Sequence, residues 1–202
     1  AVSPPGGDLS EPVTQNTLRT VQVFWSLQDK LAFQRHFPAI NWLSSYSLYL
    51  SQLSQYYQSE VNKEFMNLRR IAMEILQSES NLQETVRLVG IDALSEKEKL
   101  LLDTARAIRE DFLHQNAFDE IDTYTSLKKQ FFMLNMILEF YEAAAKVLET
   151  GIKVEQLQRM KVRSKMVRSK FIQEDKLSNF DQIIQEMNQE LKSLSAATKE
   201  RE

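Results

Sequence analysis

The 202-residue sequence contains no cysteine, which excludes disulfides, thiolate metal sites and cysteine catalysis. It has only four prolines and four glycines, and most of them fall within its first twelve residues. Beyond that segment only Pro38, Gly90 and Gly151 interrupt the chain. So few breakers over so long a stretch indicate a mainly helical protein.

Residues that could carry a reaction are also scarce. His36 and His114 are the only histidines, and no motif pairs them, so we expect a surface or helix-end histidine and no metal site. The glycine pair at 6–7 is not followed by the lysine and the hydroxyl residue of a phosphate-binding loop. Ser126 and Lys129 have the S-x-x-K spacing without its partner motifs, which favours a helix start. We therefore expect no catalytic residue in this chain.

Charge and hydropathy limit the partners. The 25 basic and 28 acidic residues give a formal charge of -3, which argues against nucleic acid as the main partner. No apolar run approaches the roughly 20 residues of a membrane-spanning helix, so any membrane contact should be indirect. The chain opens without methionine in a turn-rich segment, Ser3–Asp8, and we expect it to be part of a longer polypeptide.

The first forty-odd residues have the pattern of a small mixed α/β lobe. Thr20–Trp25 is rich in β-branched and aromatic residues and predicts a short strand. A single strand is not stable alone, so its partner is expected in missing sequence. A short helix is expected over Leu27–Gln34, and Pro38 favours extended backbone at Phe37.

From Ser45 onward the apolar residues recur at helical spacing, which predicts a bundle of about five or six helices. Capping boxes are expected at Ser80–Gln83 and Ser95–Glu98. Long helices are expected from Leu127 to Gly151 and after Ser178, with frayed residues from 195 onward. The predicted fold is mainly α, with the mixed lobe at its N-terminal end.

Three aromatic residues lie beside breaks in regular structure: Phe37, Phe118 and Tyr124. Rings on loops are well placed to stack on a planar base, worth roughly 1–3 kcal/mol per base. The alternative is that each ring belongs to the core.

One segment is strongly basic, with no acidic residue between Glu155 and Glu174. Its cationic residues are Arg159, Lys161, Arg163, Lys165, Arg168 and Lys170. A solvated helix face or a contact to an acidic subunit explains this basic run better than nucleic acid or lipid does, because aromatic residues are not interleaved with it.

Several motifs together resemble the C-terminal part of the catalytic A subunit of V-type and A-type rotary ATPases. They are the SPPGGD segment at 3–8 with EPVTQNT at 11–17, FPAINW at 37–42, SYSLY at 45–49, and Arg109–Tyr124. The resemblance covers nearly the whole chain and weakens after about residue 170. It implies that residues 1–45 end the nucleotide-binding domain and that 46–202 form the C-terminal helical domain.

The resemblance also implies functional roles. Phe37, Phe118 and Tyr124 correspond to the adenine pocket, and a turn near 90–99 corresponds to the lever that touches the rotating central stalk. The residues of that turn are Asp92, Ala93, Leu94, Ser95, Glu96, Lys97 and Glu98. Ala93 and Lys97 make it less acidic than the related turn of F-type β subunits, so shape and stiffness matter more than charge; a plain surface turn is the alternative.

Cofactors and partners follow in the same way. ATP or ADP with Mg²⁺ would bind the full subunit, while no tightly bound cofactor is expected on these residues alone. The partners would be non-catalytic B subunits and central-stalk subunits, in a cytoplasmic head peripheral to the membrane that couples ATP hydrolysis or synthesis to H⁺ or Na⁺ transport. A different function remains open: a stand-alone helical scaffold that binds protein partners through residues 159–170.

Overall fold

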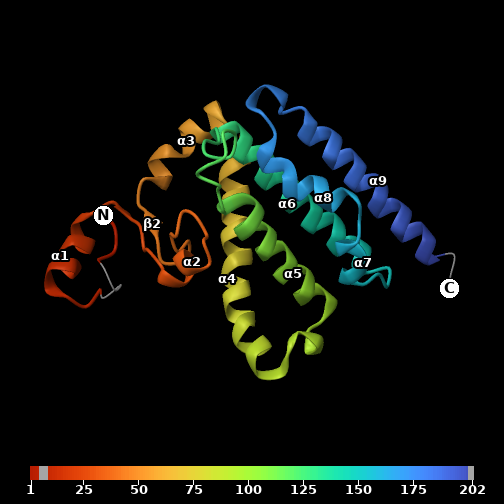
Figure 1. The fold of residues 1–202 in the computed structure, drawn as a ribbon, viewed down its shortest axis with the longest axis horizontal. Helices are drawn as coiled ribbons and strands as arrows, with labels where there is room; N and C mark the ends of the chain where they lie inside the picture. The colour runs from red at the N-terminus through yellow and green to blue at the C-terminus, as the bar shows by residue number, and fades with distance from the viewer. Residues whose placement is uncertain (5–8, 200–202) are drawn as a thin grey trace.

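A computed structural model describes residues 1–4 and 9–199 (Figure 1). The fold is mainly α, as predicted, and the described residues also contain one two-stranded sheet. Its α-helices are α1 (Pro12–Thr20), α2 (Asp29–Phe33), α3 (Leu50–Glu60), α4 (Phe65–Val89), α5 (Glu96–Ala107), α6 (Leu127–Leu148), α7 (Val154–Gln158), α8 (Val162–Val167) and α9 (Asn179–Lys199). Within this part of the chain, no helix is long and apolar enough to cross a membrane.

The N-terminal lobe differs from the prediction in its strand. β1 is only Val23–Phe24, and it pairs antiparallel with β2, Tyr46–Ser47, within this chain. The expected strand was too long because Thr20 ends α1, where its hydroxyl donates to the carbonyl of residue 16. The expected helical start at Ser45 was also too early, because β2 supplies the partner that β1 needs. Residues 5–8 of the expected turn lie outside the described part.

The helix α4 contradicts the predicted start at Ser80–Gln83. It runs unbroken for 25 residues from Phe65 to Val89, and Ser80 lies exposed in its interior. Buried Ile75, Leu76 and Glu79 continue the helical pattern into this region, so no chain break exposes the N–H groups that a cap would satisfy. The predicted stop at Gly90 is confirmed, since its φ of 81° ends α4.

The capping box at the start of α5 is confirmed. The Ser95 hydroxyl accepts a hydrogen bond from the Glu98 N–H at 3.3 Å, and the Glu98 carboxylate accepts from the Ser95 N–H at 2.8 Å. The Ser95 hydroxyl also donates to the Glu98 carboxylate at 2.6 Å. This bond, followed by the one from the Ser95 N–H, holds the pKa of Glu98 below its usual value. The reciprocal bonds fix the point where the chain turns from α4 into α5.

Substituting Ser95→Ala should therefore loosen the first turn of α5 by about 1 kcal/mol, the usual effect of losing an N-cap. We expect faster amide hydrogen exchange at Glu98 in the full-length subunit, with exchange at Lys129 unchanged. Equal acceleration at both amides would mean that the substitution destabilises the whole domain rather than this cap.

The helix α6 is the centre of the bundle (Figure 1). Leu134, Ile137 and Leu138 on it pack with α4 and α5, whereas Met136 and Phe140 pack against α9 and the segment between α6 and α9. A helix that is apolar on opposite faces is buried between two layers. Its predicted start is confirmed, because Ser126 accepts from the Lys129 N–H at 3.1 Å.

The C-terminal part contains more helices than predicted. α3 to α9 number seven, because the segment between α6 and α9 folds into the short helices α7 and α8 with two 3₁₀ turns, η4 (Arg168–Phe171) and η5 (Glu174–Lys176). The predicted last helix is confirmed as α9. Residues 195–199, expected to fray, continue that helix, and 200–202 lie outside the description.

Candidate functional site

The end of α5 connects the bundle to the N-terminal lobe. At Ile108–Leu113 the helix widens into a π-helix, η3, whose last bond runs from the His114 N–H to the Arg109 carbonyl at 2.9 Å. The next N–H, of Gln115, donates to the Phe37 carbonyl of the lobe at 2.7 Å. Phe37 is thereby held beside the loop that carries the other two predicted aromatic residues.

The loop from His114 to Ser126 is held by its own carboxylates. Asp119 Oδ1 accepts from the N–H groups of Ile121 and Asp122, both at 2.9 Å, and these bonds lower the pKa of Asp119. The buried Asp122 carboxylate accepts from the Asn116 N–H at 2.6 Å. The loop is therefore a fixed turn rather than a loose connection.

The three predicted aromatic side chains lie on the surface. Phe118 is 98% exposed, Tyr124 72% and Phe37 52%, so the alternative that they belong to the core is wrong for this structure. Large rings that are half to almost fully exposed on a braced backbone are typical of a binding surface rather than of packing. The backbone bond between Gln115 and Phe37 brings the three into one region.

Sequence reasoning missed the polar cluster beneath this loop. The rings of His36 and His114 stack with centroids 5.0 Å apart, and His36 Nε2 lies 2.9 Å from the Arg109 carbonyl. Burial, followed by the nearby Lys170 and His36, lowers the pKa of His114. His114 does stand at a helix end, as expected, but the pairing of the two histidines joins segments 78 residues apart that no local pattern connects.

Lys129 and Lys170 complete this cluster. Lys129 is fully buried, and its Nζ donates to the Lys170 carbonyl at 2.7 Å. Burial lowers the pKa of Lys129, partly offset by the acidic Glu174 and Asp122 nearby. The S-x-x-K spacing was the only local signal at Lys129, and it indicates the helix cap rather than the buried amine.

The predicted lever turn lies at the tip of the α4–α5 hairpin, at the other end of α5 from the Phe118 loop (Figure 1). Ile91–Ala93 form the 3₁₀ turn η2, and Leu94 is buried, so it anchors the turn instead of facing a partner. Sequence reasoning did not single out the apolar surface beside it. Leu88 is 86% exposed, and Val89 and Ile91 are also exposed.

Glu96 ties this tip to the next layer of helices. Its Oε2 accepts from the Val154 N–H at 2.7 Å, and its Oε1 lies 3.0 Å from Lys99 Nζ. The Val154 bond, with a smaller contribution from Lys99, lowers the pKa of Glu96 from its usual 4.5. The ionised carboxylate therefore favours the folded state.

This lowered pKa predicts a pH effect. The stabilisation from Glu96 is fully present above about pH 4.5, the unfolded value, and is lost as the pH falls through the lower folded value. Far-UV circular dichroism of the full-length subunit should show a shallower acid transition for Glu96→Gln than for the parent. Identical acid slopes in both proteins would contradict a stabilising role of the Glu96 charge.

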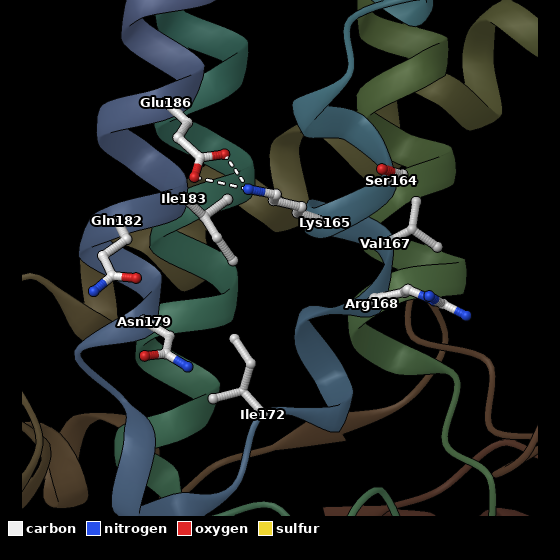
Figure 2. A pocket seen from close by; sticks show the side chains of 9 residues that line it. All are labelled: Ser164, Lys165, Val167, Arg168, Ile172, Asn179, Gln182, Ile183 and Glu186. Carbon is white, nitrogen blue, oxygen red and sulfur yellow. Dashed lines mark hydrogen bonds and ion pairs between the residues drawn. The ribbon is translucent and has the colours of Figure 1, made fainter.

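Three of the six cations of the basic run, Arg163, Lys165 and Lys170, form ion pairs within the chain. Arg163 pairs with buried Asp103 at 2.7 Å. Lys165 reaches from α8 to Glu186 on α9 at 2.6 Å (Figure 2). Lys165 and Glu186 border a groove between α8 and α9 with a volume of about 640 Å³. Arg159, Lys161 and Arg168 remain exposed. The run is thus only partly the solvated face that the sequence indicated.

The described residues contain no group of three or more histidine or carboxylate side chains arranged to hold a metal ion. In this part of the chain the site therefore offers few groups that could bind a metal ion or carry a reaction. Its main features are exposed aromatic rings, a loop held by hydrogen bonds and a helical hairpin. Such an arrangement can bind a flat ligand and transmit movement.

Family models match both parts of the chain. The model described as the C-terminal domain of V and A type ATP synthase matches residues 54–158. The nucleotide-binding domain model of the ATP synthase alpha/beta family matches residues 1–47. The chain belongs to the family of V- and A-type ATP synthases.

Curated relatives agree with that family. V-type ATP synthase alpha chains of Thermoanaerobacter pseudethanolicus and Acetivibrio thermocellus are 55% and 53% identical over 96% and 97% of this chain. That of Clostridium botulinum is 54% identical over 96%. The chain spans about a third of the length of these relatives, 33% in each case.

A solved structure shares the fold. The ATP synthase subunit NeqB from Nanoarcheaum equitans superposes with a TM-score of 0.57 over 68% of this chain and 32% of its own, at 22% identity. At that identity the likeness concerns the fold alone.

Proposed function

We propose that these residues are the adenine-contacting and motion-transmitting end of the catalytic subunit of an ion-translocating V/A-type rotary ATPase. Residues 1–45 end its nucleotide-binding domain, and 46–202 form its helical domain. The whole subunit binds ATP or ADP with Mg²⁺ and hydrolyses or synthesises ATP. The residues described here hold the base, and chemistry at the phosphates belongs to the rest of the subunit.

The observation that carries this proposal is the exposure of Phe118 and Tyr124 on a loop that is fixed to Phe37. A ring can stack on adenine only if its face is free, and it adds affinity only if its position costs little ordering on binding. Phe118 meets the first condition by its near-complete exposure, and the hydrogen bonds of Asp119 and Asp122 meet the second.

Movement would pass from this loop to the tip of the hairpin. The loop is continuous with the end of α5, and the tip begins the same helix, roughly 25 Å away at about 1.5 Å per residue. Side chains of α5 pack against those of α4 and α6 and hold it in place. A hinge at Trp42–Tyr49, between lobe and bundle, would let nucleotide binding tilt the hairpin against the central stalk.

The proposal includes the partners of this subunit. Non-catalytic B subunits would flank the catalytic subunit, and central-stalk subunits would meet the apolar tip. The whole head would lie on the cytoplasmic side, peripheral to the membrane. The scaffold alternative is not favoured, because Arg163 and Lys165, on which it depends, are occupied by Asp103 and Glu186.

Photolabelling of the assembled ATPase with 2-azido-ATP tests the proposal. After digestion and mass spectrometry, we expect the label on Phe37, Phe118 or Tyr124, and excess ATP should suppress it. Label that excess ATP suppresses, found only outside 37 and 115–125, would overturn the adenine role of these rings.

A further inference from the structure

We propose that Lys170, at the end of the basic run, is a positioning residue that holds the Phe118–Tyr124 loop against the end of α5. This role rests on the proposed function of that loop in holding adenine. The basic run carried no such role in the sequence, where Lys170 is one of six similar cations.

The first step is the set of carbonyl groups at the end of α5. A helix end leaves its last carbonyls without partners within the helix. In a continuing π-helix the Gln115 N–H would donate to the Glu110 carbonyl, but it donates to Phe37 instead. Lys170 Nζ takes the vacated place, donating to the carbonyls of Glu110 at 3.2 Å and His114 at 2.9 Å. A cation is favourable at this negative end of the helix.

The second step is the carboxylate that braces the loop. Lys170 Nζ lies 3.8 Å from Asp122 Oδ2, and both side chains are nearly buried, with 12% and 2% of their surface exposed. The same oxygen accepts from the Asn116 N–H. Lys170 therefore compensates a buried negative charge that holds the loop closed, and without Lys170 that charge would lose its ion-pair partner, although Lys129 also lies nearby.

The third step is the placement of Lys170 itself. Its carbonyl accepts the hydrogen bond of the fully buried Lys129, which fixes η4 against the start of α6. Arg168, two residues earlier, is exposed, so the contact with the loop belongs to Lys170 and is not shared by every cation of the basic run. Lys170 thus joins three separate segments: the end of α5, the loop and the start of α6.

The test uses Lys170→Met in the assembled ATPase. We expect amide hydrogen exchange at residues 116–123 to accelerate by about tenfold or more, the range expected for losing hydrogen bonds to a charged group. The KM for ATP should rise about fivefold, with kcat within about twofold, because the competent loop is less populated. Lys170→Arg, which keeps the charge, should restore most of both.

The matched control is Lys165→Met, which removes another lysine of the basic run, one whose partner Glu186 is also partly exposed. We expect its loop exchange and KM to equal those of the parent. If Lys165→Met and Lys170→Met loosen the loop equally, a general loss of charge explains the effect, and the positioning role is overturned.

The outcomes separate this proposal from the one on which it rests. Faster loop exchange with an unchanged KM supports the positioning role and removes adenine binding from the loop. Unchanged loop exchange in Lys170→Met overturns the positioning role, whatever happens to KM. If Lys170→Met fails to assemble, Asp122→Asn keeps an oxygen for the Asn116 N–H and removes the charge; faster exchange then supports the proposal, and unchanged exchange overturns it.

Discussion

Replacing Phe118 by alanine in the assembled ATPase should raise the KM for ATP by roughly 5- to 150-fold, which corresponds to losing about 1–3 kcal/mol of stacking on the base. The value of kcat should change far less, because stacking on the base acts on nucleotide binding rather than on the reaction at the phosphates. Steady-state hydrolysis over a range of ATP concentrations gives both constants.

Because Phe118 is exposed, the substitution tests nucleotide binding separately from folding. At 98% exposed, the ring makes little contact with the rest of the chain, so its removal should leave folding and assembly intact. The control is Phe118→Tyr, which keeps an aromatic face and should retain most of the affinity. A parent-like KM for Phe118→Ala would remove this residue from the pocket, and a fall in kcat alone would point to a role in movement.

Replacing both Leu88 and Ile91 by serine should uncouple hydrolysis from ion transport. Fully burying such a side chain contributes about 1.5–3 kcal/mol, so removing two should weaken the proposed contact of the tip with the stalk by about 100-fold or more. ATP hydrolysis by the soluble head should persist, while ions transported per ATP fall sharply. Reconstituted vesicles allow both rates to be measured on one preparation.

The control for the tip is Glu84→Ser, on α4 one turn before Leu88, where the parent side chain is exposed and polar. Its transport per ATP should match the parent. Full coupling in the Leu88, Ile91 double variant would show that these apolar residues do not meet the stalk. Loss of hydrolysis in that variant would contradict a purely transmitting role for the tip.

Local signals predicted the helical parts of this fold well. The caps at Ser95 and Ser126 and the stop at Gly90 need only neighbouring residues, and all three are confirmed. Ser80 and Gln83 have the same capping-box spacing as Ser95 and Glu98. A capping residue acts only where the preceding chain is not helical, and the residues of α4 before Ser80 are already helical.

Contacts between segments far apart in the sequence could not be predicted from local patterns. The pairing of β1 with β2 and the stacking of His36 on His114 depend on how the lobe meets the bundle. The same holds for Lys170, whose partners lie 48 to 60 residues earlier. The aromatic candidates could be named because they stand beside breaks in regular structure, whereas the groups that brace them, Asp119, Asp122 and Lys170, look like ordinary surface charges in the sequence.

The π-helix at the end of α5 has a consequence for angular phase. A π-type hydrogen bond spans one residue more than an α-type bond, and each residue of an α-helix advances about 100° around the helix axis. That single additional residue decides which way His114 and Gln115 emerge, and so whether the N–H of Gln115 faces the Phe37 carbonyl. The azimuth of the whole aromatic loop is thus set by the hydrogen-bond register of one turn.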